Sequence, residues 1–176
     1  YRSRFQAVDP SLRRWAGFIV LQALAGETNV ARQWLNDWDT EARAFTIRDL
    51  AHRRVAESMI NLADGQAPAA LMDLESVAQE LECPRCFERE RAVVLEDLQR
   101  YSEAIEIWER VRSRPLMLVG GFERAIAIKN LARLYEMEGR REDAIVAHRT
   151  LVEMWQSGDG RLQSQVETSR ARITEL

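Results

Sequence analysis

The chain has little glycine, little proline, no excess of basic charge and no long apolar run. Its 176 residues contain only 8 Gly and 4 Pro. Alanine and leucine, with 22 and 18 copies, are abundant instead. Because glycine and proline interrupt helices while alanine and leucine favour them, we expect a mostly helical protein. The composition, 46% apolar and 30% charged, excludes a disordered tail and is ordinary for a soluble globular protein.

The charge balance argues against a nucleic-acid partner. The formal net charge is −3 at pH 7, whereas dedicated nucleic-acid binders usually carry a strong basic excess. Lysine is nearly absent: Lys129 is the only one among 25 basic residues. We interpret this arginine bias as that of a GC-rich bacterial genome.

The longest apolar run, residues 15–26, is too short to cross a membrane. A spanning helix needs about 20 apolar residues, so we expect no direct membrane insertion of this chain. Arg13 and Arg14 before the run also resemble a twin-arginine signal, but we favour a helix that opens a repeat. We expect a soluble bacterial domain, either cytoplasmic or, if an upstream membrane segment tethers it, periplasmic.

Internal similarity is the most informative feature. The same pattern follows Ala70, Ala104 and Ala144. In each case the next residue is aliphatic, the residue four positions after the alanine is bulky, and the residue seven positions after it is aliphatic. This spacing places all of them on one helical face. The first two alanines are 34 residues apart and the next two are 40 apart, and a weaker copy begins at Ala31.

A break lies five residues before each of these alanines. Three of the breaks hold a glycine, Gly26, Gly65 and Gly139, and the fourth holds Gln99. A helix that ends in a left-handed residue favours glycine at that position. We therefore predict a unit of helix, short turn and helix, about 34 residues long.

This unit resembles the tetratricopeptide repeat (TPR). The best copy, residues 125–158, has small and bulky packing residues where the motif has them. These are Leu131, Ala132, Tyr135, Gly139, Ala144 and Leu151. It departs from the motif at His148, where an aromatic residue is usual, and at Gln156, where proline is usual.

The resemblance implies an all-α fold, a right-handed superhelix (α-solenoid) in a single domain covering residues 1–176. The implied repeats are about 12–39, 51–84, 85–118 and 125–158, followed by a capping helix at 161–175. Residues 131–176 also resemble the ends of TPR regions in bacterial serine/threonine kinases and regulators. The chain itself has no kinase signature.

In the TPR family the first helix of each repeat lines a concave groove. The resemblance therefore implies a mixed apolar groove with a basic strip. Its candidate partner-binding residues are Met59, Arg89, Val93, Ile126, Lys129 and Arg133. Arginine pairs well with carboxylates, so an extended acidic segment or a peptide C-terminus would suit the strip.

We therefore expect a protein partner and a non-catalytic interaction or scaffold module. Two alternatives stay open: a permanent structural subunit of a larger complex, which could be membrane-associated, and a sensor or recruitment domain of a bacterial serine/threonine kinase. We find no catalytic constellation and no metal or cofactor motif, so we expect no enzyme and no cofactor. The carboxylates spread along helices, where pairing with arginine four positions away explains them.

Cys83 and Cys86 form a CxxC pair with several interpretations. A thioredoxin-like site needs a βαβ context that the sequence lacks, haem attachment needs a following histidine, and zinc needs two more ligands. His52 and His148 are far apart and unpaired, and we assign them to a solvated face and to the core. A redox-sensitive disulfide stays open, and we favour a helix-starting turn with small buried cysteines.

Overall fold

A computed structural model describes residues 15–41, 45–115 and 121–176, with the backbone alone at 121 and 122. The expected start of the first repeat, at 12–14, and the end of the third, at 116–118, lie outside the described residues. All secondary structure within the described ranges is helical, with no strand. The expected all-α fold is therefore confirmed.

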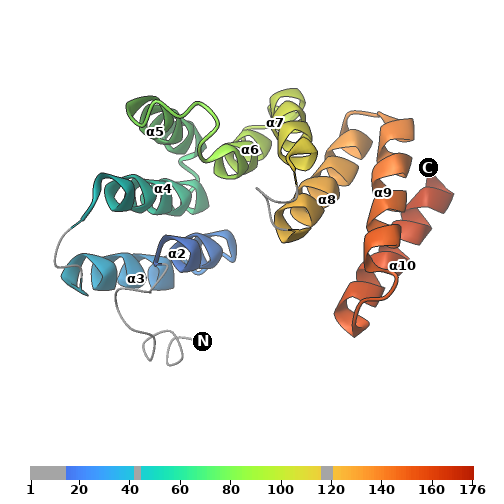
Figure 1. Ribbon diagram of the computed structural model, residues 1–176, viewed down its shortest axis with the longest axis horizontal. Helices are drawn as coiled ribbons and strands as arrows, with labels where there is room; N and C mark the ends of the chain where they lie inside the picture. The colour runs from blue at the N-terminus through green and yellow to red at the C-terminus, as the bar shows by residue number, and fades with distance from the viewer. Residues whose placement is uncertain (1–14, 42–44, 116–120) are drawn as a thin grey trace. The chain divides into compact units, whose positions relative to one another are not determined.

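The chain divides into two compact units, residues 1–98 and 99–176. The described helices of the first unit are α2 (Trp15–Leu24), α3 (Thr28–Glu41), α4 (Ile47–Ala63), α5 (Ala67–Glu80) and α6 (Glu88–Asp97). In this unit α2 packs against α3 and α4, α4 packs against α5, and α5 packs against α6 (Figure 1).

The second unit is built in the same way. Its described helices are α7 (Tyr101–Ser113), α8 (Gly121–Met137), α9 (Arg141–Trp155) and α10 (Gly160–Glu175). Each helix packs against the next one along the chain (Figure 1). In both units, helices that follow one another in sequence are neighbours in space, which is consistent with an α-solenoid.

The alanines of the repeated pattern belong to the buried core. Ala31, Ala70, Ala104 and Ala144 are completely buried. A small side chain at these points lets two helix backbones approach closely. Among the residues that the structure describes, Trp108 is the largest side chain that is completely buried.

The predicted left-handed breaks are confirmed. Gly26, Gly65, Gly139 and Gln99 have φ values of 80°, 79°, 69° and 58°. At Gly139, for example, two backbone hydrogen bonds close the end of α8. The Gly139 N–H donates to the Glu136 carbonyl at 3.1 Å, and the Arg140 N–H donates to the Tyr135 carbonyl at 2.7 Å. This is a Schellman motif, and it satisfies carbonyls that the helix end would otherwise leave open.

Among the residues that the structure describes, no helix is both long enough and apolar enough for a bilayer crossing.

Candidate binding faces and a disulfide turn

One face of α8 carries three of the predicted binding residues. Ile126, Lys129 and Arg133 follow one another at helical spacing, and Met137 continues the same row. We call these four residues the α8 stripe. Lys129 and Arg133 are exposed, Met137 is 49% exposed and Ile126 is partly exposed. The stripe therefore presents two cations between two apolar side chains.

The two cations of the α8 stripe differ in their surroundings. An Nη1 atom of Arg133 lies 3.2 Å from the Met137 sulfur, which is a contact within the stripe. Lys129 forms no hydrogen bond or ion pair with any other described residue. An exposed ammonium without a carboxylate neighbour can accept one from a partner.

The other three predicted residues lie in the first unit. Met59, on α4, is completely buried and belongs to the core, so its side chain does not reach the surface. Arg89 and Val93 lie one turn apart on α6 and are partly exposed. Arg89 pairs with the neighbouring Glu90, with 2.9 Å between Nη2 and Oε1. This ion pair compensates the charge of Arg89 locally, unlike that of Lys129.

A polar cluster joins the last three helices, and the sequence pattern did not reveal it. Glu136 of α8 contacts His148 of α9, with 2.6 Å between Oε1 and Nε2. Its other carboxylate oxygen accepts a hydrogen bond from Arg172 Nε of α10 at 3.0 Å. The Arg172 guanidinium and, more weakly, His148 lower the pKa of Glu136 against the opposing effect of burial. The cluster therefore connects α10 to α8 and α9 by polar contacts.

Tyr135 makes a similar connection between α7 and α8. Its hydroxyl donates to Glu109 Oε1 at 2.6 Å, and the Arg140 guanidinium lies 4.4 Å from the centre of its ring. Burial and the Glu109 carboxylate raise the pKa of Tyr135 to about 12. The tyrosine therefore stays a neutral hydrogen-bond donor at neutral pH and links α7 to α8 through this bond.

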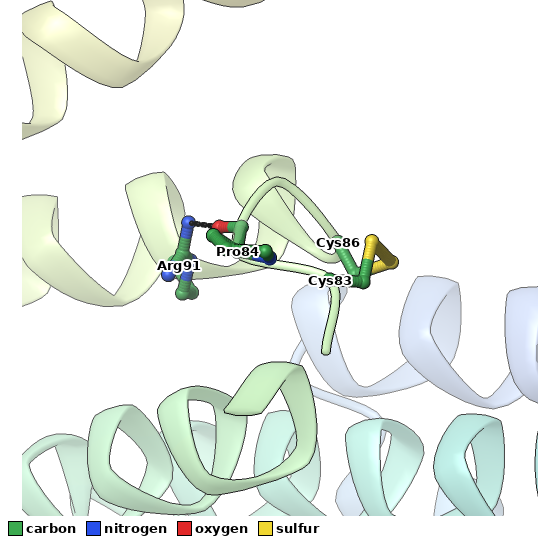
Figure 2. Close-up of a disulfide and its surroundings, with 4 residues drawn as sticks. All are labelled: Cys83, Pro84, Cys86 and Arg91. Atoms are coloured by element: carbon green, nitrogen blue, oxygen red, sulfur yellow. Dashed lines mark hydrogen bonds between the residues drawn. A yellow bond between two sulfur atoms is a disulfide. The ribbon is translucent and has the colours of Figure 1, made fainter. Parts of the chain in front are cut away.

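Cys83 and Cys86 are joined by a disulfide in the turn between α5 and α6 (Figure 2). The helix-starting turn is confirmed, but the cysteines are partly exposed and bonded to each other rather than buried thiols. The two-residue spacer brings their Cα atoms to 5.4 Å, within the range that a disulfide can span.

The remaining candidate ligands have local explanations. His52 Nδ1 lies 2.7 Å from the Arg48 carbonyl oxygen, and its ring meets the Phe87 ring edge-on at 5.6 Å. Within the described ranges, no group of three or more His, Cys, Asp or Glu side chains could hold a metal ion.

No protein-family model matches the chain, and no curated protein matches it either.

Proposed function

We propose that the chain is a non-catalytic, TPR-like module of about four repeats in a right-handed superhelix, and that it binds a protein partner through the exposed face of α8. The observation that carries this proposal is the α8 stripe, in which Lys129 lacks any partner among the described residues. Opposite charges three or four positions apart stabilise a surface helix, but no carboxylate lies at such a position from Lys129. Two exposed cations between apolar ends favour a partner that supplies carboxylates.

The spacing of the stripe limits the form of this partner. Lys129 and Arg133 are four residues apart, which is about 6 Å along a helix axis. Alternate residues of an extended chain are separated by about 6.6 Å. An extended segment with acidic residues at alternate positions would therefore match both cations. Ile126 and Met137, about 16 Å apart along the axis, would contact apolar residues at its two ends.

The test uses peptides selected from a displayed random library on the wild-type chain. Their affinities are then measured by fluorescence polarisation for the Lys129→Glu/Arg133→Glu variant. We expect acidic peptides to be enriched and the variant to bind them at least about tenfold more weakly, since hydrogen-bonded charge pairs contribute about 1.5–3 kcal/mol each. The melting temperature should not fall, because both side chains are exposed.

A matched control separates the stripe from the general effect of charge. Arg149→Glu/Arg161→Glu makes the same charge change at exposed positions of α9 and α10 in the same unit. Its affinity should stay close to that of the wild type. Selected peptides without acidic residues, or equal weakening by both variants, would refute the assignment to α8.

A permanent structural subunit is the second candidate, and exposed apolar pairs in the first unit favour it. Leu21 and Leu24 on α2 are 60% and 48% exposed, and Ile47 and Leu50 on α4 are 79% and 47% exposed. Each pair lies one turn apart on its helix and would contribute to an apolar interface. Salt screens a charged contact but not an apolar one. A stoichiometric partner that survives high salt, and that Leu21→Ser/Leu24→Ser releases, would favour this candidate.

A further inference from the structure

The disulfide connects two elements that are held in different ways. Cys83 belongs to the end of α5: its N–H donates to the Ala78 carbonyl at 2.9 Å, and the Glu82 N–H donates to that of Gln79 at 2.9 Å. Glu82 has a φ of 49°, so these bonds form a Schellman motif with a non-glycine residue in the left-handed position. The backbone of α5 therefore holds Cys83 in place without help from the sulfur.

Cys86 lies at the start of α6, which has weak support of its own. The N-cap residue, Phe87, has a φ of 56° and caps the helix with no side-chain hydrogen bond. The helix has ten residues, and its buried apolar side chains are Ala92, Val94 and Leu95. Helices of this length are marginal alone in water. A left-handed backbone at a bulky residue adds a further conformational cost.

Two non-covalent contacts also hold the turn. Arg91 Nη2 donates to the Pro84 carbonyl oxygen at 2.8 Å, as Figure 2 shows. The Phe87 ring lies edge-on against His52 of α4. Neither contact uses a cysteine sulfur. They would guide the first turn of α6 back to its place when the disulfide re-forms.

We propose that Cys83 and Cys86 form a thiol–disulfide exchange site whose reaction partner is a dithiol, and that its reduction releases the first turn of α6 from α5. The turn is accessible: both cysteines are partly exposed, and Pro84 and Arg85 between them are exposed. This inference does not depend on the α8 stripe, because α6 and α8 belong to different units.

The exchange is balanced as a two-electron reaction. A thiolate of the dithiol attacks one cysteine sulfur, forms a mixed disulfide and displaces the other cysteine as a thiolate, which takes up a proton. The second thiol of the reductant then displaces the remaining cysteine and closes its own disulfide. The protein gains two electrons and two protons, and the dithiol loses them.

The expected size of the effect follows from the loop that the disulfide closes. Cys83 and Cys86 are three positions apart, so the loop holds four residues. The chain-entropy relation for a loop of this length gives about a twentyfold rise in the opening equilibrium on reduction. The rise should be confined to the turn and the first turn of α6, because Cys83 keeps its backbone bond to α5.

The experiment measures amide hydrogen exchange by mass spectrometry before and after treatment with dithiothreitol, without denaturant. We expect no reactive thiols before treatment and two after it. Exchange at the amides of Cys86 and Arg91, which donate to the Cys83 and Phe87 carbonyls, should become about twentyfold faster, while α5, α8 and α9 stay unchanged. The Cys83→Ser/Cys86→Ser variant should show the fast exchange from the outset and should not respond to dithiothreitol.

Three results would overturn the proposal. Free thiols in the air-oxidised protein would show that the disulfide does not form, and resistance to dithiothreitol in the folded chain would show that the site is closed to exchange. Unchanged protection of α6 after complete reduction would show that the disulfide does not control that helix. If the double variant fails to fold, the comparison of oxidised and reduced wild-type chain decides alone.

Discussion

The end of α8 allows a backbone preference to be measured with little interference from packing. Gly139 has a φ of 69°, and a Cβ added there would meet no heavy atom within 4 Å. The substitution Gly139→Ala therefore adds a methyl group to open space, and in the folded state it changes only the cost of the backbone conformation. For an alanine, the left-handed region costs about 1–2 kcal/mol.

A second term opposes this cost. Replacing glycine by alanine restricts the unfolded chain, which stabilises the folded state by about 0.4–1 kcal/mol where the native backbone suits alanine. The net expectation for Gly139→Ala is a loss of about 1 kcal/mol in the free energy of unfolding. Gly160 provides the matched control, since a Cβ there also meets nothing within 4 Å and its φ lies outside the left-handed region. Gly160→Ala should therefore stabilise the protein.

Urea unfolding of the two variants, followed by tryptophan fluorescence, tests this reasoning. The midpoints should move in opposite directions while the dependence on urea concentration stays that of the wild type. The difference between the two variants should be about 1–2 kcal/mol, because the unfolded-state term is common to both. Midpoints that move in the same direction would refute the assignment of the penalty to the left-handed backbone.

Two further predictions concern the second unit. Because Arg172 and His148 lower the pKa of Glu136 below its ordinary value of 4.5, the carboxylate stabilises the fold above that pH, and this contribution is lost as the pH falls through the lowered pKa. Thermal unfolding of the wild type and of Glu136→Gln, measured from neutral pH downward, tests this. The stability advantage of the wild type should shrink below pH 4.5. An advantage that stays constant would contradict the assignment. Ala144→Leu should destabilise by about 1–3 kcal/mol through overpacking, whereas Val146→Leu, at a site that is 56% exposed, should have little effect on the urea midpoint; equal effects would contradict the packing argument.

The parts of the fold that the sequence predicts well are those decided within one turn of helix. A helix end needs a residue that tolerates positive φ, and the breaks before the repeated alanines supplied that signal even at Gln99, which has a φ of 58°. The alanine register was equally local, because the period of a helix alone decides which side chains share a face. Ala31 and Ala144, the first and last of the series, are both completely buried.

Features that depend on contacts between helices were not visible in the sequence. The left-handed backbone of Glu82 was not predicted either, because no glycine occupies that position. Pairing at helical spacing explains only some of the carboxylates, since Arg53 of α4 binds Asp39 of α3 at 2.7 Å. Glu136 and Arg172 are 36 positions apart, and no periodicity connects them. Such pairs require knowledge of which helix faces which.

The sequence also could not show which cations among the predicted binding residues pair with a carboxylate. The repeat pattern treats Arg89, Lys129 and Arg133 as equivalent cations, because each lies on the first helix of a predicted repeat. The structure separates them by their neighbours: Glu90 compensates Arg89, whereas Lys129 has no carboxylate beside it among the described residues. A cation already paired loses that partner when it binds another carboxylate, so an unpaired one gains more. The affinity of the chain for acidic peptides should therefore depend on α8 far more than on Arg89.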